Sequence, residues 1–282
     1  MKLFKTSKGI LLEGYGKNYL LNEEWDRLIN RDNLFEYLSK QINEEKYFDD
    51  AVTSSMEENF IQAPICKQEV WAAGVTYLRS RDARMEESKD SGGADFYSKV
   101  YNAERPELFF KAQPHRVAAH KEKVFIRKDS KWNVPEPELT LFINSSGNIQ
   151  GYTIGNDMSS RDIEGENPLY LPQAKVYNRS AALGPCLYVP EEPLSLETKI
   201  SIAIKRQGIA VFENDIQLNR MKRNFDELAE YLFRECDFEN GAFLMTGTGI
   251  VPPNDFTLQP GDQINISVDN IGTLTNTVAY NS

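Results

Sequence analysis

The chain has 282 residues, of which 40% are hydrophobic, and its formal net charge at pH 7 is −10. A hydrophobic fraction of this size supplies a substantial core and argues against wholesale disorder. The acidic balance argues against a general nucleic-acid-binding protein, which would need a basic face. The three cysteines are widely spaced and form no CxxC or Cys/His pattern, so we expect buried free thiols in a reducing compartment.

The first residues, MKLFKTSKGILLEGYGKNYL, contain no apolar stretch followed by a small-residue cleavage site, and no apolar run in the chain is long enough to span a bilayer. We therefore expect a cytoplasmic protein with no membrane partner. Residues 1–22 are predicted to form short strands and residues 23–41 two helical segments. Together they predict a small N-terminal α+β domain over residues 1–66, followed by a larger domain over residues 67–282.

The larger domain begins with an apolar segment, residues 69–77, that predicts a buried strand ending in a turn. Residues 78–88 favour helix and carry alternating charges, which is typical of a solvated surface helix. A Gly-Gly loop follows within residues 89–94. A charged helix followed by such a loop is also compatible with a lid over a site, and this alternative stays open.

Two ionisable side chains flank the next apolar strand. Glu107 follows a proline and precedes Leu-Phe-Phe, and Lys111 ends the strand. A partly buried carboxyl at position 107 would have a raised pKa, which suits an acid or base near neutral pH. For Lys111 alone, the ordinary interpretation is a surface lysine with a buried aliphatic stem.

The segment from Val134 to Ile143 places Glu136 and Glu138 two residues apart at the head of an apolar strand. Side chains two apart on a strand share one face, at a spacing of about 6.5 Å. Two like charges on a mostly buried strand are costly unless a positive charge lies between them, and a hard divalent cation with oxygen ligands would supply it. The alternative is a solvated edge strand that carries two surface acids, since the neighbouring prolines offer no N–H.

A hairpin favours the metal interpretation. Ser145-Ser146-Gly147-Asn148 is a strong turn signal, and the strand that follows runs into Asp157. Such a hairpin would bring Asp157 back beside the paired glutamates. Three carboxylates with water form an ordinary Mg²⁺ or Ca²⁺ shell.

Residues 163–174 contain several glycine and proline breaks and predict a loop, with Lys175 just after it. Alone, this lysine would be an ordinary surface residue, but beside a metal site it could act as a general base or an anion anchor. The remaining chain is β-rich, with one amphipathic helix capped by Asn224. A Gly/Thr loop, residues 246–249, follows a buried strand and could offer N–H and hydroxyl donors to an anion.

These pieces, taken in order, resemble the fumarylacetoacetate hydrolase family over roughly residues 70–282. The resemblance implies an α+β, β-rich fold, a mixed β-sandwich roll, with a divalent metal held by Glu136, Glu138 and Asp157. That metal is usually Mg²⁺, with Mn²⁺ or Ca²⁺ as alternatives. It also implies a 2-oxo acid or 1,3-dicarbonyl substrate and a homodimer or homotetramer. The matching segments are Gly74-Val75-Thr76-Tyr77, Leu108-Phe109-Phe110-Lys111, Glu136-Pro137-Glu138-Leu139, residues 151–162, Lys175, Gly184-Pro185, Thr246-Gly247-Thr248 and residues 258–262.

One departure from the family pattern is informative. Hydrolytic members carry His and then Glu three residues later, whereas this chain has Ser80 and Ala83, and its two histidines lie elsewhere. Without that pair, no group is evident that would activate water for cleavage of a carbon–carbon bond. The local pattern instead resembles the 2-keto-3-deoxy-pentonate dehydratase branch, in which residues at the positions of Glu107 and Lys175 belong to the active site.

The resemblance therefore predicts a metal-dependent hydro-lyase that converts a 2-keto-3-deoxy sugar acid to 2,5-dioxopentanoate. Loss of a C3 proton from the metal-chelated 2-oxo acid would give an enolate, with Lys175 and Glu107 as catalytic base and acid in either order. The alternative is an acylpyruvate hydrolase or oxaloacetate decarboxylase of the same family. The residues that we expect to contact substrate are Arg79, Ser80, Lys111, Thr246 and Thr248.

Overall fold

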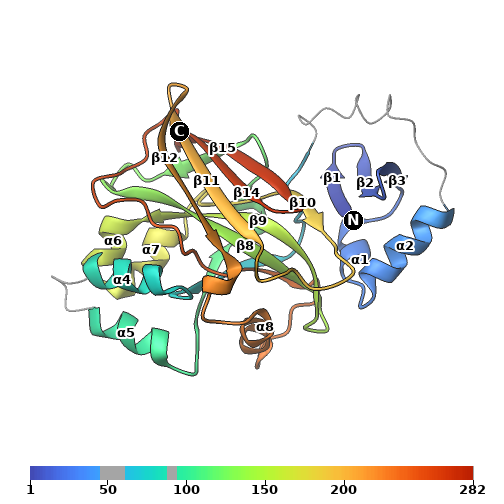
Figure 1. Ribbon diagram of the computed structural model, residues 1–282, viewed down its shortest axis with the longest axis horizontal. Coiled ribbons are helices and arrows are strands. Elements are labelled where there is room, and N and C mark those ends of the chain that lie inside the picture. Colours follow the sequence, from blue (N-terminus) through green and yellow to red (C-terminus); the bar gives the residue numbers. More distant parts are fainter. Residues whose placement is uncertain (45–60, 88–93, 282) are drawn as a thin grey trace.

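The computed structural model describes residues 1–44, 61–87 and 94–281. These residues form two β-sheets packed face to face, with helices at both ends of the molecule (Figure 1). The predicted α+β, β-rich class is therefore confirmed. No helix in the described ranges is long and apolar enough to cross a membrane.

The larger sheet has the strand order β3-β2-β1-β10-β9-β8-β13-β4-β5, and β6 pairs beside β10. It is mixed: β4 runs parallel to β13, while β8 runs antiparallel to both of its neighbours. Its strands are β1 (Lys2–Thr6), β2 (Gly9–Gly14), β3 (Lys17–Leu21), β4 (Glu69–Gly74), β5 (Glu107–Ala112), β6 (Val117–Ala118), β8 (Asn133–Ile143), β9 (Ile149–Ser160), β10 (Ala181–Tyr188) and β13 (Ala242–Met245).

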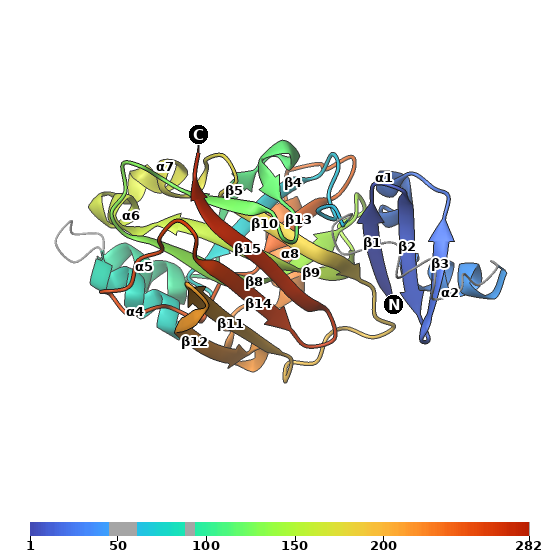
Figure 2. The same cartoon turned by 90° about the horizontal axis from the view of Figure 1, so that it is seen from above.

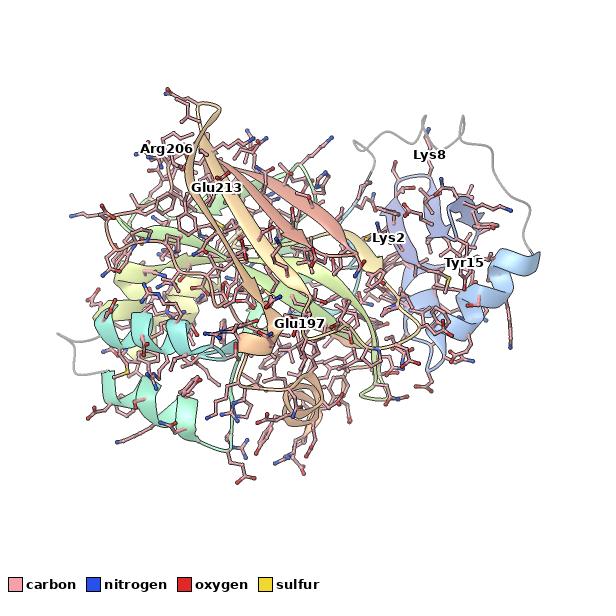
Figure 3. All side chains as sticks on the ribbon, viewed as in Figure 1. Lys2, Lys8, Tyr15, Glu197, Arg206 and Glu213 are labelled. Carbon is pink, nitrogen blue, oxygen red and sulfur yellow. The ribbon has the colours of Figure 1, made fainter. Side chains whose placement is uncertain are left out.

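The smaller sheet has the order β12-β11-β14-β15-β7 and lies across one face of the larger one (Figures 1 and 2). Arg206 and Glu213 lie on the hairpin that β11 makes with the outer strand β12 (Figure 3). The strands of this sheet are β7 (Lys123–Ile126), β11 (Lys199–Arg206), β12 (Ile209–Gln217), β14 (Gln263–Val268) and β15 (Gly272–Tyr280).

Strand β8 separates two hydrophobic cores because its side chains alternate in direction. Leu139, Leu141 and Ile143 belong to the core between the two sheets. Phe142 belongs to a second core on the opposite face, which the N-terminal strands and helices complete. Glu136 and Glu138 share the parity of Phe142, so the acidic pair lies on the face of the large sheet that the small sheet does not cover.

The N-terminal strands extend the large sheet. Strand β1 pairs with β10 in the register Lys2 with Tyr188, and the Met1 amino group donates to Val189 O. Helices α1 (Trp25–Ile29) and α2 (Leu34–Glu44) lie beside them at one end of the molecule (Figure 2). The predicted boundary near residue 66 stays a prediction.

Short helices gather at the other end of the molecule (Figures 1 and 2). Residues 163–174, predicted as a loop, are largely helical, because Pro168 and Pro172 occupy first-turn positions where proline's missing N–H costs nothing. The predicted lid loop, residues 89–94, lies outside the described residues except for Ala94. The helices here are α4 (Leu78–Glu87), α5 (Ala94–Asn102), α6 (Arg161–Glu166), η3 (Pro168–Tyr170) and α7 (Leu171–Lys175).

Three further helical segments of the described ranges lie elsewhere. Helix α8 is capped as predicted, since the Asn224 side chain accepts a hydrogen bond from the Glu227 N–H at 2.7 Å. Its buried residues Leu228, Ala229 and Leu232 pack into the inter-sheet core, as its amphipathic pattern predicts. These segments are η2 (Pro114–Arg116), η4 (Leu218–Arg220) and α8 (Phe225–Phe233).

The three cysteines are free thiols, but the expectation that all are buried is wrong. Cys66 and Cys236 are exposed. Cys186 lies on β10 between the sheets, and burial raises the pKa of its thiol to about 12. The thiolate is the reactive form of cysteine, so Cys186 is both inaccessible and unreactive.

Titration of the native protein with a thiol reagent is therefore expected to modify Cys66 and Cys236 quickly, and Cys186 only after addition of denaturant. A Cys186→Ala variant should show the same number of reactive thiols before and after unfolding. Modification of three thiols at similar rates in native wild-type protein would contradict the placement of Cys186.

Candidate metal centre and active site

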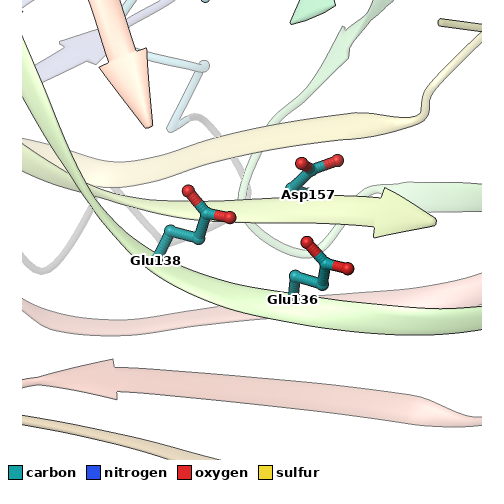
Figure 4. A group of neighbouring side chains, drawn as sticks. All are labelled: Glu136, Glu138 and Asp157. Atoms are coloured by element: carbon teal, nitrogen blue, oxygen red, sulfur yellow. The ribbon is translucent and has the colours of Figure 1, made fainter. Parts of the chain in front are cut away.

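Three buried carboxylates meet on the β8–β9 hairpin. In the register of the two strands Glu136 faces Asp157, and Glu138 lies two residues along β8. One carboxylate oxygen from each residue lies within 4.8 Å of the other two, and Figure 4 shows the three groups around a common space. The predicted convergence is confirmed. With exposures of 4% or less, the solvated-edge alternative is wrong.

The prolines of this strand fit their places. The pairing of β8 with β13 ends at Thr140, so the N-terminal portion of β8, residues 133–139, pairs with β9 alone. Pro135 and Pro137 lie in that half-paired portion, where a missing N–H is tolerated. Both are nevertheless buried. The acidic end of β8 therefore lacks a strand neighbour on one side without being open to water.

Two fully buried lysines neutralise part of this acidic charge. The Lys175 Nζ at the end of α7 lies 2.7 Å from Glu136 Oε2 and 3.1 Å from Asp157 Oδ2. The Lys111 Nζ at the end of β5 lies 2.5 Å from Asp157 Oδ1 and donates to Met158 O at 3.0 Å. The surface-lysine interpretation is wrong for both residues, because each ammonium points inward to a carboxylate.

Two buried arginines complete the charge network. Arg161, the first residue of α6, lies 3.1 Å from Glu136 Oε1 through its Nη2. Arg84 of α4 lies 3.4 Å from the same oxygen and pairs through Nη1 with Glu164. Glu164 also accepts a hydrogen bond from the Ser159 hydroxyl at 3.1 Å. Four acids and four cations therefore share one buried region.

Sequence reasoning missed Arg84, Arg161 and Glu164. The helix that carries Arg84 was predicted to lie on the surface because of its alternating charges. Its inward face is instead marked by the small residues Ser80 and Ala83, which are buried together with Arg84. Their i, i+3, i+4 spacing was the available signal.

Glu138 differs from the other acids because, among the described residues, no cation lies within ion-pair distance of it; the more distant Lys175 charge opposes the rise in its pKa. Its Oε2 accepts a hydrogen bond from the Gly247 N–H at 2.6 Å, and it forms no ion pair within the described part of the chain. Burial, then the charges of Asp157 and Glu136, raise the pKa of Glu138 well above its usual value. This carboxylate therefore gains most from an added positive charge.

The donor set fits a hard divalent cation. It offers three carboxylates and no cysteine or histidine, which suits Mg²⁺, Mn²⁺ or Ca²⁺ rather than zinc. A cation here would share the oxygens of Glu136 and Asp157 with the Lys175 ammonium. It would also supply the positive charge that Glu138 lacks.

Two loops lock together beside Glu138. The Thr76 hydroxyl donates to Thr246 O at 2.7 Å. Gly247 has a φ of +91°, and a Cβ on it would lie 2.1 Å from Thr76 Oγ1. Only glycine adopts this φ without strain and leaves room for the Thr76 hydroxyl. The position of Gly247 in turn fixes the N–H that donates to Glu138.

Glu107, at the start of β5, lies close to this charge network. Burial raises the pKa of its carboxyl, while Arg84 and Lys175 oppose that rise. It also lines a separate cavity of about 670 Å³, whose other walls are mostly apolar. The raised pKa agrees in direction with the expectation for a partly buried acid.

The predicted substrate-contact residues lie in different environments. Ser80 and Thr248 line the carboxylate cavity, whereas Arg79 is exposed. The Thr246 hydroxyl is buried and donates to Leu139 O at 2.8 Å. Lys111 is held by Asp157. Direct contact with substrate stays a prediction for all five. The carboxylate cavity is lined by Ala73, Gly74, Val75, Ser80, Arg84, Phe109, Glu136, Glu138, Asp157, Arg161, Lys175, Gly247 and Thr248.

Comparison with known proteins identifies the family. The model of the fumarylacetoacetate (FAA) hydrolase C-terminal family matches residues 70–279. This chain belongs to that family. The match covers both sheets except for the three N-terminal strands, and it contains the whole charge network described above.

Two relatives are similar to most of this chain. A probable 2-keto-3-deoxyxylonate dehydratase from Haloferax volcanii is 45% identical over 232 residues, which cover 81% of this chain and 78% of that protein. The 2-dehydro-3-deoxy-D-arabinonate dehydratase of Saccharolobus solfataricus is 38% identical over 288 residues, which cover 97% and 95%.

A solved structure shows the same fold. A 2-keto-3-deoxy-D-arabinonate dehydratase complexed with magnesium and 2,5-dioxopentanoate superposes with a TM-score of 0.82. It is 33% identical to this chain, and the comparison covers 100% of this chain and 99% of that one. The N-terminal region is therefore part of the shared architecture.

The charge network predicts opposite stability changes for two similar substitutions in metal-free protein. Glu138→Gln should raise the melting temperature, because it removes an unpaired buried charge while the amide oxygen still accepts from Gly247. Glu136→Gln should lower the free energy of unfolding by roughly 3–5 kcal/mol, because it takes the shared partner from Lys175, Arg161 and Arg84.

Thermal unfolding in EDTA and then in excess Mg²⁺ measures both effects. Each variant should lose the stabilisation that Mg²⁺ gives to wild-type protein, and the exposed control Glu166→Gln should keep it. Equal destabilisation by Glu138→Gln and Glu136→Gln in EDTA would contradict the charge assignment.

Proposed function

We propose that this chain is a Mg²⁺-dependent dehydratase of 2-keto-3-deoxy-pentonates and that its product is 2,5-dioxopentanoate. The observation that carries the proposal is the buried trio of carboxylates with the Lys175 ammonium against two of them. The relatives named as dehydratases of this substrate class support it. The reaction removes one water, as a proton from C3 and a hydroxyl from C4, and the product tautomerises to the dioxo acid.

The proposed metal ligands are Glu136, Glu138 and Asp157. A divalent cation bound there would supply Lewis-acid polarisation of the 2-oxo group, which makes the neighbouring C3 proton more acidic. Arg161 and Arg84 hold the Glu136 carboxylate from its other oxygen. The Gly247 N–H holds Glu138. These contacts fix the ligands before any substrate binds, which is the condition for a precisely placed site.

Lys175 and Glu107 are the proposed proton carriers. The pKa of Glu107 is raised by burial, so its carboxyl retains a proton at higher pH than an exposed glutamate and can donate it to the departing C4 hydroxyl. That assignment leaves Lys175, which lies against the proposed metal ligands, to accept the C3 proton, for which its ammonium must first lose a proton to solvent and become a neutral amine. Ser80 and Thr248 line the same cavity and are proposed to orient the substrate.

The hydrolase alternative lacks its machinery. The Ser80 hydroxyl donates to Tyr77 O at 2.8 Å, and Ala83 has no ionisable group. No histidine lines the carboxylate cavity within the described residues. A water molecule there would have no histidine base, so cleavage of a carbon–carbon bond by hydrolysis is disfavoured.

The direct test is an activity assay with 2-keto-3-deoxy-pentonates of both C4 configurations, in which 2,5-dioxopentanoate is followed. Product should form with Mg²⁺ and be lost with EDTA, and the two isomers should turn over at different rates. Absence of product from both isomers in the presence of Mg²⁺ would contradict the proposal. The acylpyruvate hydrolase and oxaloacetate decarboxylase reactions would then be assayed on the same protein.

The role of Glu107 predicts that Glu107→Gln lowers kcat by about 10²–10⁴-fold, because the amide cannot donate a carboxyl proton. The metal dependence of the residual activity should stay as in wild type, since Glu107 is not a proposed ligand. Glu104→Gln, on an exposed glutamate three residues earlier, is the matched control. A kcat for Glu107→Gln within a few-fold of the control would remove Glu107 from the mechanism.

Four finer expectations belong to this proposal. Mg²⁺ is the proposed metal, with Mn²⁺ and Ca²⁺ as alternatives. A homodimer or homotetramer is the proposed assembly, and the cytoplasm the proposed location. The substrate is a small 2-oxo sugar acid, with no nucleic-acid or membrane partner.

A further inference from the structure

Gly74 and Glu107 form a cross-strand pair at the end of the β4–β5 ladder. The Glu107 side chain lies directly over the Gly74 α-carbon: a Cβ built on Gly74 would lie 2.1 Å from Glu107 Oε2 and 2.5 Å from its Cδ. Real Cβ atoms essentially never show such contacts, so the end of the Glu107 side chain would have to move aside. The glutamate therefore occupies space that any other residue at position 74 would fill.

The backbone gives no other reason for a glycine at this position. Gly74 is not among the residues with a positive φ, so an alanine could adopt its backbone conformation without strain. The next residue is the one with the unusual backbone. Val75 has a φ of 55°, in the left-handed region that is unfavourable for a β-branched side chain. The turn is thus made at Val75, and the glycine serves a steric purpose.

The place of Gly74 shows what that purpose is. Gly74 lines the carboxylate cavity, together with Arg84 and Lys175, whereas Glu107 lines the larger, mostly apolar cavity between α5, β5 and the segment of η3 and α7. By crossing the bare α-carbon, the Glu107 carboxyl leaves its own strand and approaches the charge network. Both Arg84 and Lys175 act on it electrostatically.

We propose that Gly74 is a positioning residue for the dehydration reaction, because its lack of a side chain lets the Glu107 carboxyl lie across β4 toward Lys175. This inference rests on the proposed catalytic role of Glu107. Gly74 itself touches no reacting atom. A methyl group at position 74 would push the carboxyl away while leaving the metal ligands and Lys175 in place.

The kinetic test is a double-mutant cycle between Gly74→Ala and Glu107→Gln. Gly74→Ala should lower kcat by about 10²-fold, as expected for misplacement of a catalytic group by about 1 Å. Its KM and its Mg²⁺ dependence should stay near wild type. In the Glu107→Gln background the alanine should have little further effect on kcat, since the group that it displaces is already inactive. Independent, multiplicative effects of the two substitutions would overturn the proposal.

A second cycle measures the contact itself without using activity. Thermal unfolding is compared for wild type, Gly74→Ala, Glu107→Ala and the double variant. The alanine at position 74 should destabilise the protein when Glu107 is present and much less when Glu107→Ala has removed the side chain that it meets. An equal loss in both backgrounds would overturn the proposal. If Gly74→Ala alone fails to fold, the double variant decides: it should fold if the Glu107 side chain causes the failure, and its failure to fold would overturn the proposal.

The two cycles separate this inference from the proposed function. If wild-type protein has no dehydratase activity, the proposed function fails, and the unfolding cycle still reports whether Gly74 sets the position of Glu107. If wild type is active and the unfolding cycle shows no coupling, the positioning role fails while the dehydratase proposal stands.

Discussion

The structure depends on how a group of buried charges is balanced. Three carboxylates on one hairpin would not stay ionised in a protein interior without compensation, because burial and mutual repulsion both oppose their charge. Lys111, Lys175, Arg84 and Arg161 come from four different elements to provide it. The helices α4, α6 and α7 are held over the hairpin by these ion pairs. The same contacts that bring the helices to the site therefore also orient the proposed metal ligands.

The three proposed metal ligands are not equally balanced by cations, and this difference bears on metal binding. Glu136 has three cationic partners, and Asp157 has two. Among the described residues Glu138 has a single hydrogen-bond donor, the backbone N–H of Gly247, which the contact between the Thr76 and Gly247 loops holds in place. A site whose charges were fully matched by side chains would gain little from a cation. The unmatched Glu138 carboxylate is the physical reason why a metal would be bound here rather than tolerated.

The sequence predicted the features that follow from local periodicity and turn chemistry. The hairpin turn at 145–148, the alternation along β8 and the convergence of Asp157 on Glu136 all rest on such rules and are confirmed. The family resemblance and the capped helix at Asn224 were also correct. The failures share one cause: a charged side chain looks the same in sequence whether it faces water or a buried partner. From local pattern alone, the ordinary interpretation of Lys111, Lys175 and the helix that carries Arg84 was therefore a surface position, because only the tertiary fold brings their partners together. The two lysines were predicted as site residues only through the metal hypothesis and the family resemblance.

Backbone geometry was the other part that the sequence could not supply. The segment of residues 163–174 became helical because its prolines lie in first-turn positions, which depends on where each helix begins. The steric role of Gly74 became visible only with the register of β4 and β5, since glycine in a sequence equally indicates a turn. Such a role can be predicted only when the position of a residue distant in the chain is known.

The central claim is that Glu136, Glu138 and Asp157 bind a divalent cation, and anomalous diffraction from crystals soaked in Mn²⁺ tests it most directly. The account predicts one strong anomalous peak among the three carboxylates, which is absent from Glu138→Gln crystals soaked in the same way. A wild-type map with no peak there, or with its only peak at surface acids, would contradict it.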